Sequence, residues 1–76
     1  MHCIYEVRYE VRWHSAAPDQ WEARQTRVLA GLDAQEAVEK AREAALKQRQ
    51  INDNGVEEGC TGFRLREVVL IAEASL

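Results

Sequence analysis

The residues that could bind a metal ion or act as nucleophiles are few, and their spacing suits neither role. The soft metal ligands of the sequence are His2, Cys3, His14 and Cys60. Structural zinc sites use close pairs such as C-x2-C or H-x3-H, and no such pair occurs here. No serine–histidine–aspartate or cysteine–histidine constellation stands out either. We therefore expect a protein without a metal, a cofactor or catalytic residues.

A second set of candidate ligands lies in an acidic, glycine-rich segment. Asp53, Glu57 and Glu58 flank Gly55 in a manner similar to part of a calcium-binding loop. The twelve-residue order of ligands and the terminal bidentate glutamate are missing, however. General acid–base catalysis by such carboxylates would also need a pocket to shift a pKa, and a chain of 76 residues offers little concavity. The segment 52–62 is therefore predicted to be a solvated loop, and the protein not to be an enzyme.

Aromatic residues recur at alternate positions near the start of the chain. Tyr5, Tyr9 and Trp13 would share one face of a strand, where they could stack on bases as in RNA-binding sheets. The formal net charge is −3, however, and charges of both signs are mixed along the chain, without a basic stripe. A packed core is the favoured interpretation of these aromatic residues, and nucleic-acid binding is kept as an alternative function.

The segment 4–14 carries the clearest strand pattern in the sequence. Pro18 and Asp19 favour a turn over 15–20, and 21–30 is predicted to return as the second strand of a hairpin. The alternation of the first strand places five apolar side chains on one face: Tyr5, Val7, Tyr9, Val11 and Trp13.

Charge pairing selects a register for this hairpin. With Trp13 opposite Trp21, each of the next three positions forms a favourable cross-strand pair: Arg12 with Glu22, Val11 with Ala23, and Glu10 with Arg24. A shift by one residue would place Arg8 opposite Arg27, and two like charges facing each other are unfavourable. We therefore predict the first register.

A helix is predicted to follow the hairpin. Asp33 suits the N-cap position and Glu36 the third helical position, so the two side chains can satisfy free amide groups at the helix start. Asn52 to Gly55 are predicted to end the helix. The residues at helical spacing form a narrow apolar stripe of small side chains: Ala37, Val38, Ala41, Ala44 and Ala45.

The last predicted element is an apolar strand over 63–74. Together these elements give a single α+β domain spanning residues 1–76, with the order β-β-α-β and one amphipathic helix on one face of a three-stranded sheet. A right-handed crossover through the helix would return the last strand parallel to the second and beside the first. The aromatic face of the first strand would then pack against the alanine stripe.

One helix covers one face of such a sheet and leaves the other face open. Aliphatic residues predicted to lie on this open face, between charged side chains, are Ile4, Val28, Val68, Leu70 and Ala72. An apolar patch with a charged rim is typical of an association surface, and a homodimer would cover it. Exposed aliphatic residues also occur on monomers that bind nothing, but association is the favoured interpretation.

We therefore expect a non-enzymatic domain that binds another protein or a second copy of itself. The candidate contact residues are Arg8, Glu10, Arg12, Arg24, Leu46, Val68 and Leu70. The chain lacks an apolar run of roughly 18 residues and a basic start followed by an apolar segment, so a cytoplasmic location is expected. Two cysteines are too few for a secreted disulfide framework, which agrees with this expectation.

The run from Val28 to Ala37, a strand leading into an acid-capped helix continued by Ala41, resembles small hairpin–helix–strand proteins of phages and bacterial genomes. Some anti-CRISPR proteins share this build. The resemblance implies a compact acidic protein that blocks a larger host complex by covering its nucleic-acid or partner surface. That family is defined by function, so the resemblance assigns no binding residue here.

Overall fold

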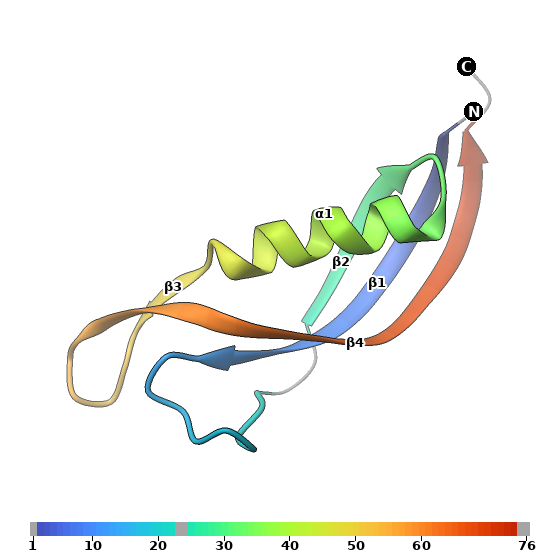
Figure 1. The fold of residues 1–76 in the computed structure, drawn as a ribbon. Helices are drawn as coiled ribbons and strands as arrows, with labels where there is room; N and C mark the ends of the chain where they lie inside the picture. The colour runs from blue at the N-terminus through green and yellow to red at the C-terminus, as the bar shows by residue number, and fades with distance from the viewer. Residues whose placement is uncertain (1, 23–24, 75–76) are drawn as a thin grey trace.

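The computed structural model describes residues 2–22 and 25–74, which form one helix on one face of a curled, four-stranded antiparallel sheet (Figure 1). The α+β prediction is confirmed, whereas the prediction of three strands is wrong. The sheet order is β2-β1-β4-β3. Along the chain the elements are β1 (His2–Trp13), β2 (Gln25–Gly31), α1 (Ala34–Leu46), β3 (Arg49–Ile51) and β4 (Glu57–Ala74).

Where β1 and β2 pair, the hairpin has the predicted register, with Cys3 opposite Gly31 and Tyr9 opposite Gln25. The predicted pair of Trp13 with Trp21 is wrong, because β2 begins at Gln25 and Trp21 contacts Arg12 and Arg64 on the other face of the sheet. Arg8 lies opposite Thr26, so the two like charges do not meet. The predicted partners Ala23 and Arg24 lie outside the described residues.

The helix begins as predicted. The side chain of Asp33 accepts a hydrogen bond of 2.8 Å from the amide of Glu36, which fixes the first turn. Ala37, Ala41 and Ala45 are fully buried on the face toward the sheet. There they pack with four side chains of β1 that are also buried: Val7, Tyr9, Val11 and Trp13.

The end of the helix differs from the prediction. α1 stops at Leu46, before the expected end near Asn52, and residues 49–51 form β3. The amide of Cys60 donates to the carbonyl of Gln48 (3.0 Å), and β3 pairs with residues 57–59 of β4. This pairing with a distant segment takes priority over the helical tendency of the Lys-Gln-Arg-Gln run.

The predicted loop over 52–62 is also wrong, because β4 begins at Glu57 and the turn is confined to residues 52–56. The side-chain oxygen of Asn52 accepts hydrogen bonds from the amides of Asn54 (3.0 Å) and Val56 (3.1 Å). Gly55 takes a positive φ of 76°, which a side chain would disfavour. The polar turn is therefore a tight hairpin connection between β3 and β4.

β4 runs antiparallel to β1, and so does β2, which places β4 in the direction of β2 with β1 between them. This arrangement confirms the predicted place of the last strand beside the first and its direction parallel to the second. The β1–β4 register shifts three times, and each shift adds one residue to β4. Each such bulge reverses the alternation of side chains along the strand. The extra residues on β4 are Thr61, Arg66 and Ile71.

The bulges overturn two predicted positions on the open face of the sheet. Val68 lies opposite Val7, and Leu70 lies opposite Tyr5. Directly opposed residues share a face, so both side chains lie on the helix side. Val68 packs there against the core, and its prediction as an open-face residue is wrong, as is that of Leu70.

Ile4, Val28 and Ala72 do lie on the side away from the helix, as predicted, because Ile4 is paired with Ala72 and Val28 with Glu6.

The described part of the chain has a single helix, α1, which falls short of the length and apolar character that crossing a membrane requires.

The close seating of α1 on the sheet leads to a first prediction. Replacing the fully buried Ala41 by leucine overfills the interface and should lower the free energy of unfolding by about 1–3 kcal/mol. The control Glu39→Leu introduces the same side chain on the exposed face and should change stability by less than about 0.5 kcal/mol. Urea unfolding measures both, and equal stability of the two variants would contradict this seating.

Candidate functional site

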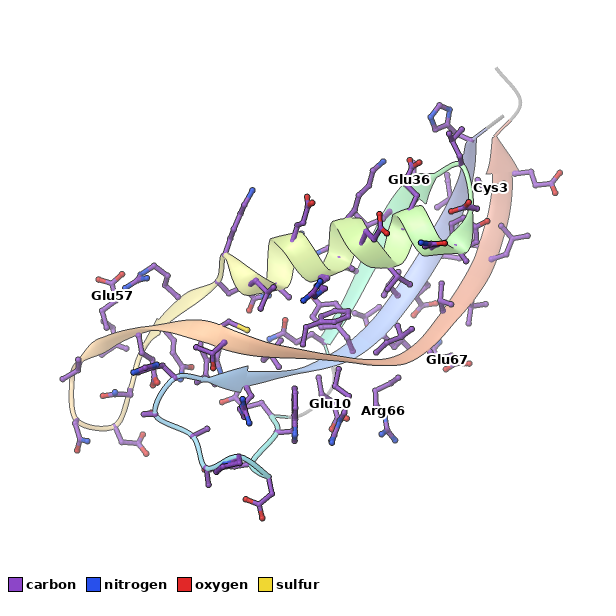
Figure 2. All side chains as sticks on the ribbon, in the orientation of Figure 1. Cys3, Glu10, Glu36, Glu57, Arg66 and Glu67 are labelled. Carbon is purple, nitrogen blue, oxygen red and sulfur yellow. The ribbon has the colours of Figure 1, made fainter. Side chains whose placement is uncertain are left out.

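The side of the sheet away from α1, which we call the open face, carries three of the predicted contact residues. Arg8, Glu10 and Arg12 occupy alternate positions of β1 on this face. Figure 2 shows the labelled side chains of Glu10, Arg66 and Glu67 extending from the sheet on the side opposite the helix. The structure therefore brings three charged members of the predicted site, Arg8, Glu10 and Arg12, onto one face of the sheet.

These charges largely neutralise one another. Arg8 forms ion pairs with Glu6 (3.2 Å) and Glu67 (2.8 Å). The hydrogen bond and charge of Glu6, followed by those of Glu67, raise the pKa of Arg8 above its ordinary value. Glu10, with 17% of its side chain exposed, pairs with Arg64 (3.0 Å) and Arg66 (3.4 Å). The open face thus carries two clusters of paired charges, one around Arg8 and one around Glu10.

Trp21 covers part of the open face, a role that the sequence pattern does not predict. The guanidinium carbon of Arg64 lies 4.5 Å from the centre of the indole ring, and that of Arg12 lies 5.5 Å away. A side chain at Gly62 would come within 3.1 Å of Trp21, so glycine permits this close approach. Trp21 belongs to the connection before β2 and not to the strand in which it was predicted.

The second half of β4 carries a cluster of exposed aliphatic residues. Leu65 lies opposite Tyr9 and Leu70 opposite Tyr5, both on the helix side, whereas Val69 lies opposite Glu6 on the open face. Leu70 and Ile71 are 50% and 51% exposed. We call the four exposed aliphatic residues the β4 cluster: Leu65, Val69, Leu70 and Ile71.

The β4 cluster lies along an unpaired sheet edge. β4 has 18 residues, whereas β3 has 3 and pairs with residues 57–59 alone. Beyond Cys60, β4 pairs with β1 on one side and with no described strand on the other. No side chain among the described residues forms a hydrogen bond with the backbone of residues 63–73. This free edge of β4 is the longest unpaired backbone of the described sheet.

The opposite edge of the sheet is treated differently. β2 is the outer strand there, and the ammonium group of Lys40 donates a hydrogen bond of 2.8 Å to the carbonyl of Ala30. Lys40 lies on α1, and its bond occupies one backbone carbonyl of β2. β2 has 7 residues against 18 in β4, so the β4 edge is the longer of the two.

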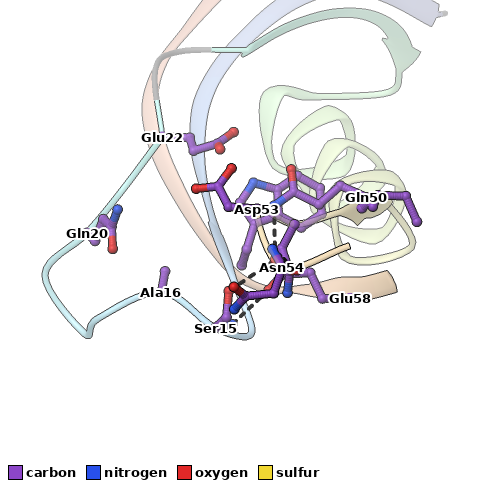
Figure 3. A pocket seen from close by; sticks show the side chains of 11 residues that line it. Ser15, Ala16, Gln20, Glu22, Gln50, Asp53, Asn54 and Glu58 are labelled. Carbon is purple, nitrogen blue, oxygen red and sulfur yellow. Dashed lines mark hydrogen bonds between the residues drawn. The ribbon is translucent and has the colours of Figure 1, made fainter. Parts of the chain in front are cut away.

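A polar pocket of about 380 Å³ lies between the 15–22 connection and the β3–β4 turn (Figure 3). Glu58 lines it, but both of its carboxylate oxygens are engaged. They accept hydrogen bonds from the amide (2.8 Å) and hydroxyl (3.0 Å) of Ser15 and from the side-chain amide of Gln50 (3.2 Å). The two hydrogen bonds from Ser15 contribute most to lowering the pKa of Glu58 below its ordinary value. Glu58 therefore joins the connection after β1 to the β3–β4 hairpin.

The pocket offers little to a reactive ligand. Trp13 also lines it, and its buried indole Nε1 has no hydrogen-bond partner among the described residues. No group of three or more histidine, cysteine, aspartate or glutamate side chains suited to a metal ion occurs in residues 2–22 and 25–74. Cys3 and Cys60 are free thiols at opposite ends of the β1–β4 pair. The β4 edge is the stronger candidate site.

The remaining predicted contact residues are scattered. Leu46 is the last residue of α1 and is 38% exposed, whereas Val68 is partly buried against the core. Arg24 lies outside the described residues. Of the β4 cluster, only Leu70 was among the predicted contacts. The apolar character of 63–74 on both faces was the signal that could have identified the others.

Comparisons with protein-family models, curated proteins and solved structures return no match for this chain.

The hydrogen bonds of Glu58 lead to a second prediction. Because its pKa is lower in the folded state, Glu58 stabilises the fold above its ordinary pKa of 4.5, and this contribution is lost as the pH falls through the folded-state value. Glu58→Gln should therefore lower the melting temperature at pH 7 and flatten its decline below pH 4.5. Glu43→Gln, on the exposed helix face, should follow the wild type in calorimetry from pH 2 to 7.

If Glu58→Gln and the wild type lost stability in parallel over that range, the carboxylate would have no special part in joining the two loops.

Proposed function

We propose that this chain is a non-catalytic protein-binding domain that takes up an extended strand of its partner along the free edge of β4. The observation that carries the proposal is the coincidence of this edge with the β4 cluster. Strand addition gains affinity from main-chain hydrogen bonds and specificity from side chains beside the edge. Leu70 and Ile71, each about half exposed, would supply apolar contacts to the incoming strand.

The chemistry of the edge indicates the kind of partner. The unpaired backbone amides and carbonyls of β4 are hydrogen-bond donors and acceptors that repeat at the spacing of a β-strand. A second extended strand, antiparallel or parallel, can therefore form hydrogen bonds with all of them. Charged groups would oppose this docking, yet residues 68–72 are all aliphatic. An extended protein segment with apolar side chains fits these requirements.

The other surfaces support the proposal by contrast. Arg8 and Glu10 on the open face are already paired with charges of the same sheet, and such exposed pairs contribute little to binding. Tyr9 and Trp13, two of the three aromatic residues of the nucleic-acid alternative, are buried beneath α1, whereas Tyr5 is half-buried. These features favour protein binding over base stacking.

An inhibitory role, of the kind that the resemblance to anti-CRISPR proteins implies, would use the same edge. A domain that adds its β4 edge to a strand of a larger complex would cover the surface around that strand. The proposal therefore assigns a contact surface to such an inhibitor without requiring a catalytic residue.

Site-specific photocrosslinking tests this function. A benzoylphenylalanine residue at Ile71, expressed in the organism that encodes the chain, should form protein adducts several-fold more often than the same residue at the exposed helix position Glu39. The adducts should disappear when Leu70→Lys is added to the Ile71 variant, because the lysine charge would be desolvated at the edge.

Equal adducts from both positions, or adducts that persist with Leu70→Lys, would overturn the edge as the binding surface.

Fluorescence anisotropy with single-stranded oligonucleotides tests the alternative function, nucleic-acid binding. Tight binding that weakens steeply with added salt would replace the proposal with nucleic-acid binding.

A further inference from the structure

We infer that Asn54 is a site of spontaneous chemical modification, where the side-chain amide is lost through a cyclic imide formed with the backbone nitrogen of Gly55. This inference is independent of the proposed function. The sequence has two asparagines, Asn52 and Asn54, and of these only Asn54 is followed by glycine. The structure of the β3–β4 turn shows why this position can react and what restrains it.

The reaction needs two neighbouring groups of the chain and water. The backbone nitrogen of Gly55, after losing its proton to hydroxide, attacks the side-chain carbonyl carbon Cγ of Asn54. A carbon–nitrogen bond forms, the bond from Cγ to the side-chain nitrogen breaks, and that nitrogen takes up protons from water and leaves as ammonia. Water then opens the five-membered imide at either of its carbonyl groups. The products are aspartate and isoaspartate at position 54, and no oxidant or reductant takes part.

The turn leaves the reacting groups open to water. Asn54 and Gly55 are both exposed, and a side chain at Gly55 would meet no atom within 4 Å. Because glycine has no Cβ, nothing on Gly55 itself crowds its nitrogen as the ring closes. Among the described residues, no hydrogen bond holds the side-chain amide of Asn54, whereas Oδ1 of Asn52 accepts two. The amide of Asn54 is therefore free to rotate toward the nitrogen that attacks it.

Asn52 restrains the reaction. Its carbonyl accepts a hydrogen bond of 2.9 Å from the amide of Gly55, and its Oδ1 accepts bonds from the amides of Asn54 and Val56. The amide of Gly55 must leave this bond before its nitrogen attacks. Exposed turns with few buried contacts open at a low cost in free energy. The fold therefore slows the loss of the amide relative to an unstructured chain without preventing it.

The products change the turn in two ways. Asn54 lines the polar pocket together with Asp53 and Glu58 (Figure 3), so a new carboxylate there adds one negative charge to an acidic group of side chains. Isoaspartate also lengthens the main chain by one methylene group. The tight turn, with its positive φ at Gly55, has no place for this extra atom. The isoaspartate form should therefore weaken the pairing of β3 with β4.

Peptide mapping by mass spectrometry tests the inference. The full chain is kept at neutral and at mildly alkaline pH for several weeks, beside an acetylated peptide of residues 49–58 as the unstructured reference. The change from amide to acid should be confined to Asn54, should be slower in the full chain than in the peptide, and should accelerate with hydroxide concentration. Isoaspartate should form beside aspartate, which is the signature of the imide.

Two variants on the same turn test the assigned roles. Asn54→Gln keeps an amide but requires a six-membered ring, and it should show no loss of ammonia over the same period. Asn52→Ala removes the acceptor for two amides of the turn and should accelerate the reaction at Asn54 several-fold. Circular dichroism before incubation establishes that both variants fold like the wild type.

Three outcomes would overturn the inference. The first is a full chain that keeps its amide after the reference peptide has reacted completely. The second is an acid at position 54 without any isoaspartate, because direct hydrolysis of the side chain yields aspartate alone. The third is an equal change at Asn52, because the residue after it, Asp53, carries a side chain.

Discussion

The fold depends on the close contact between the alanine face of α1 and the aromatic and aliphatic face of β1. Ala37, Ala41 and Ala45 bring the helix backbone near the sheet, where the larger Tyr9 and Trp13 fill the space between the layers. Small residues on one layer and large ones on the other reach the packing density of a protein interior. This contact also decides which side of the sheet is left open.

Interactions that are local in sequence could be predicted because their signals lie within a few residues of one another. Asp33 and Glu36 mark the helix start, and the alternation of β1 identifies its buried face. The hairpin register also followed from charges, because a slip would have opposed Arg8 to Arg27. In each case the competing arrangement carried a cost that could be read from residue types alone.

Two features that the sequence did not reveal, β3 and the bulges of β4, depend on how β4 pairs with its neighbours. β3 forms because residues 49–51 meet 57–59 across a tight turn, although the same residues continue a helical pattern. The three bulges in β4 arise from its pairing with β1, and a bulge leaves no periodic signal in a strand that is apolar on both faces. For this reason Val68 and Leu70 were placed on the wrong face, and the β4 cluster was only partly recognised.

The two edges of the sheet differ in a way that bears on function. Natural sheets protect their edges with short strands, charge, proline or bulges, because unpaired backbone invites association with other chains. The β2 edge is short, with 7 residues, and the start of β4 is covered by β3. The rest of the β4 edge has bulges at Arg66 and Ile71, but residues 68–72 carry neither charge nor proline. The proposed binding of a partner strand would cover this aliphatic stretch of the edge.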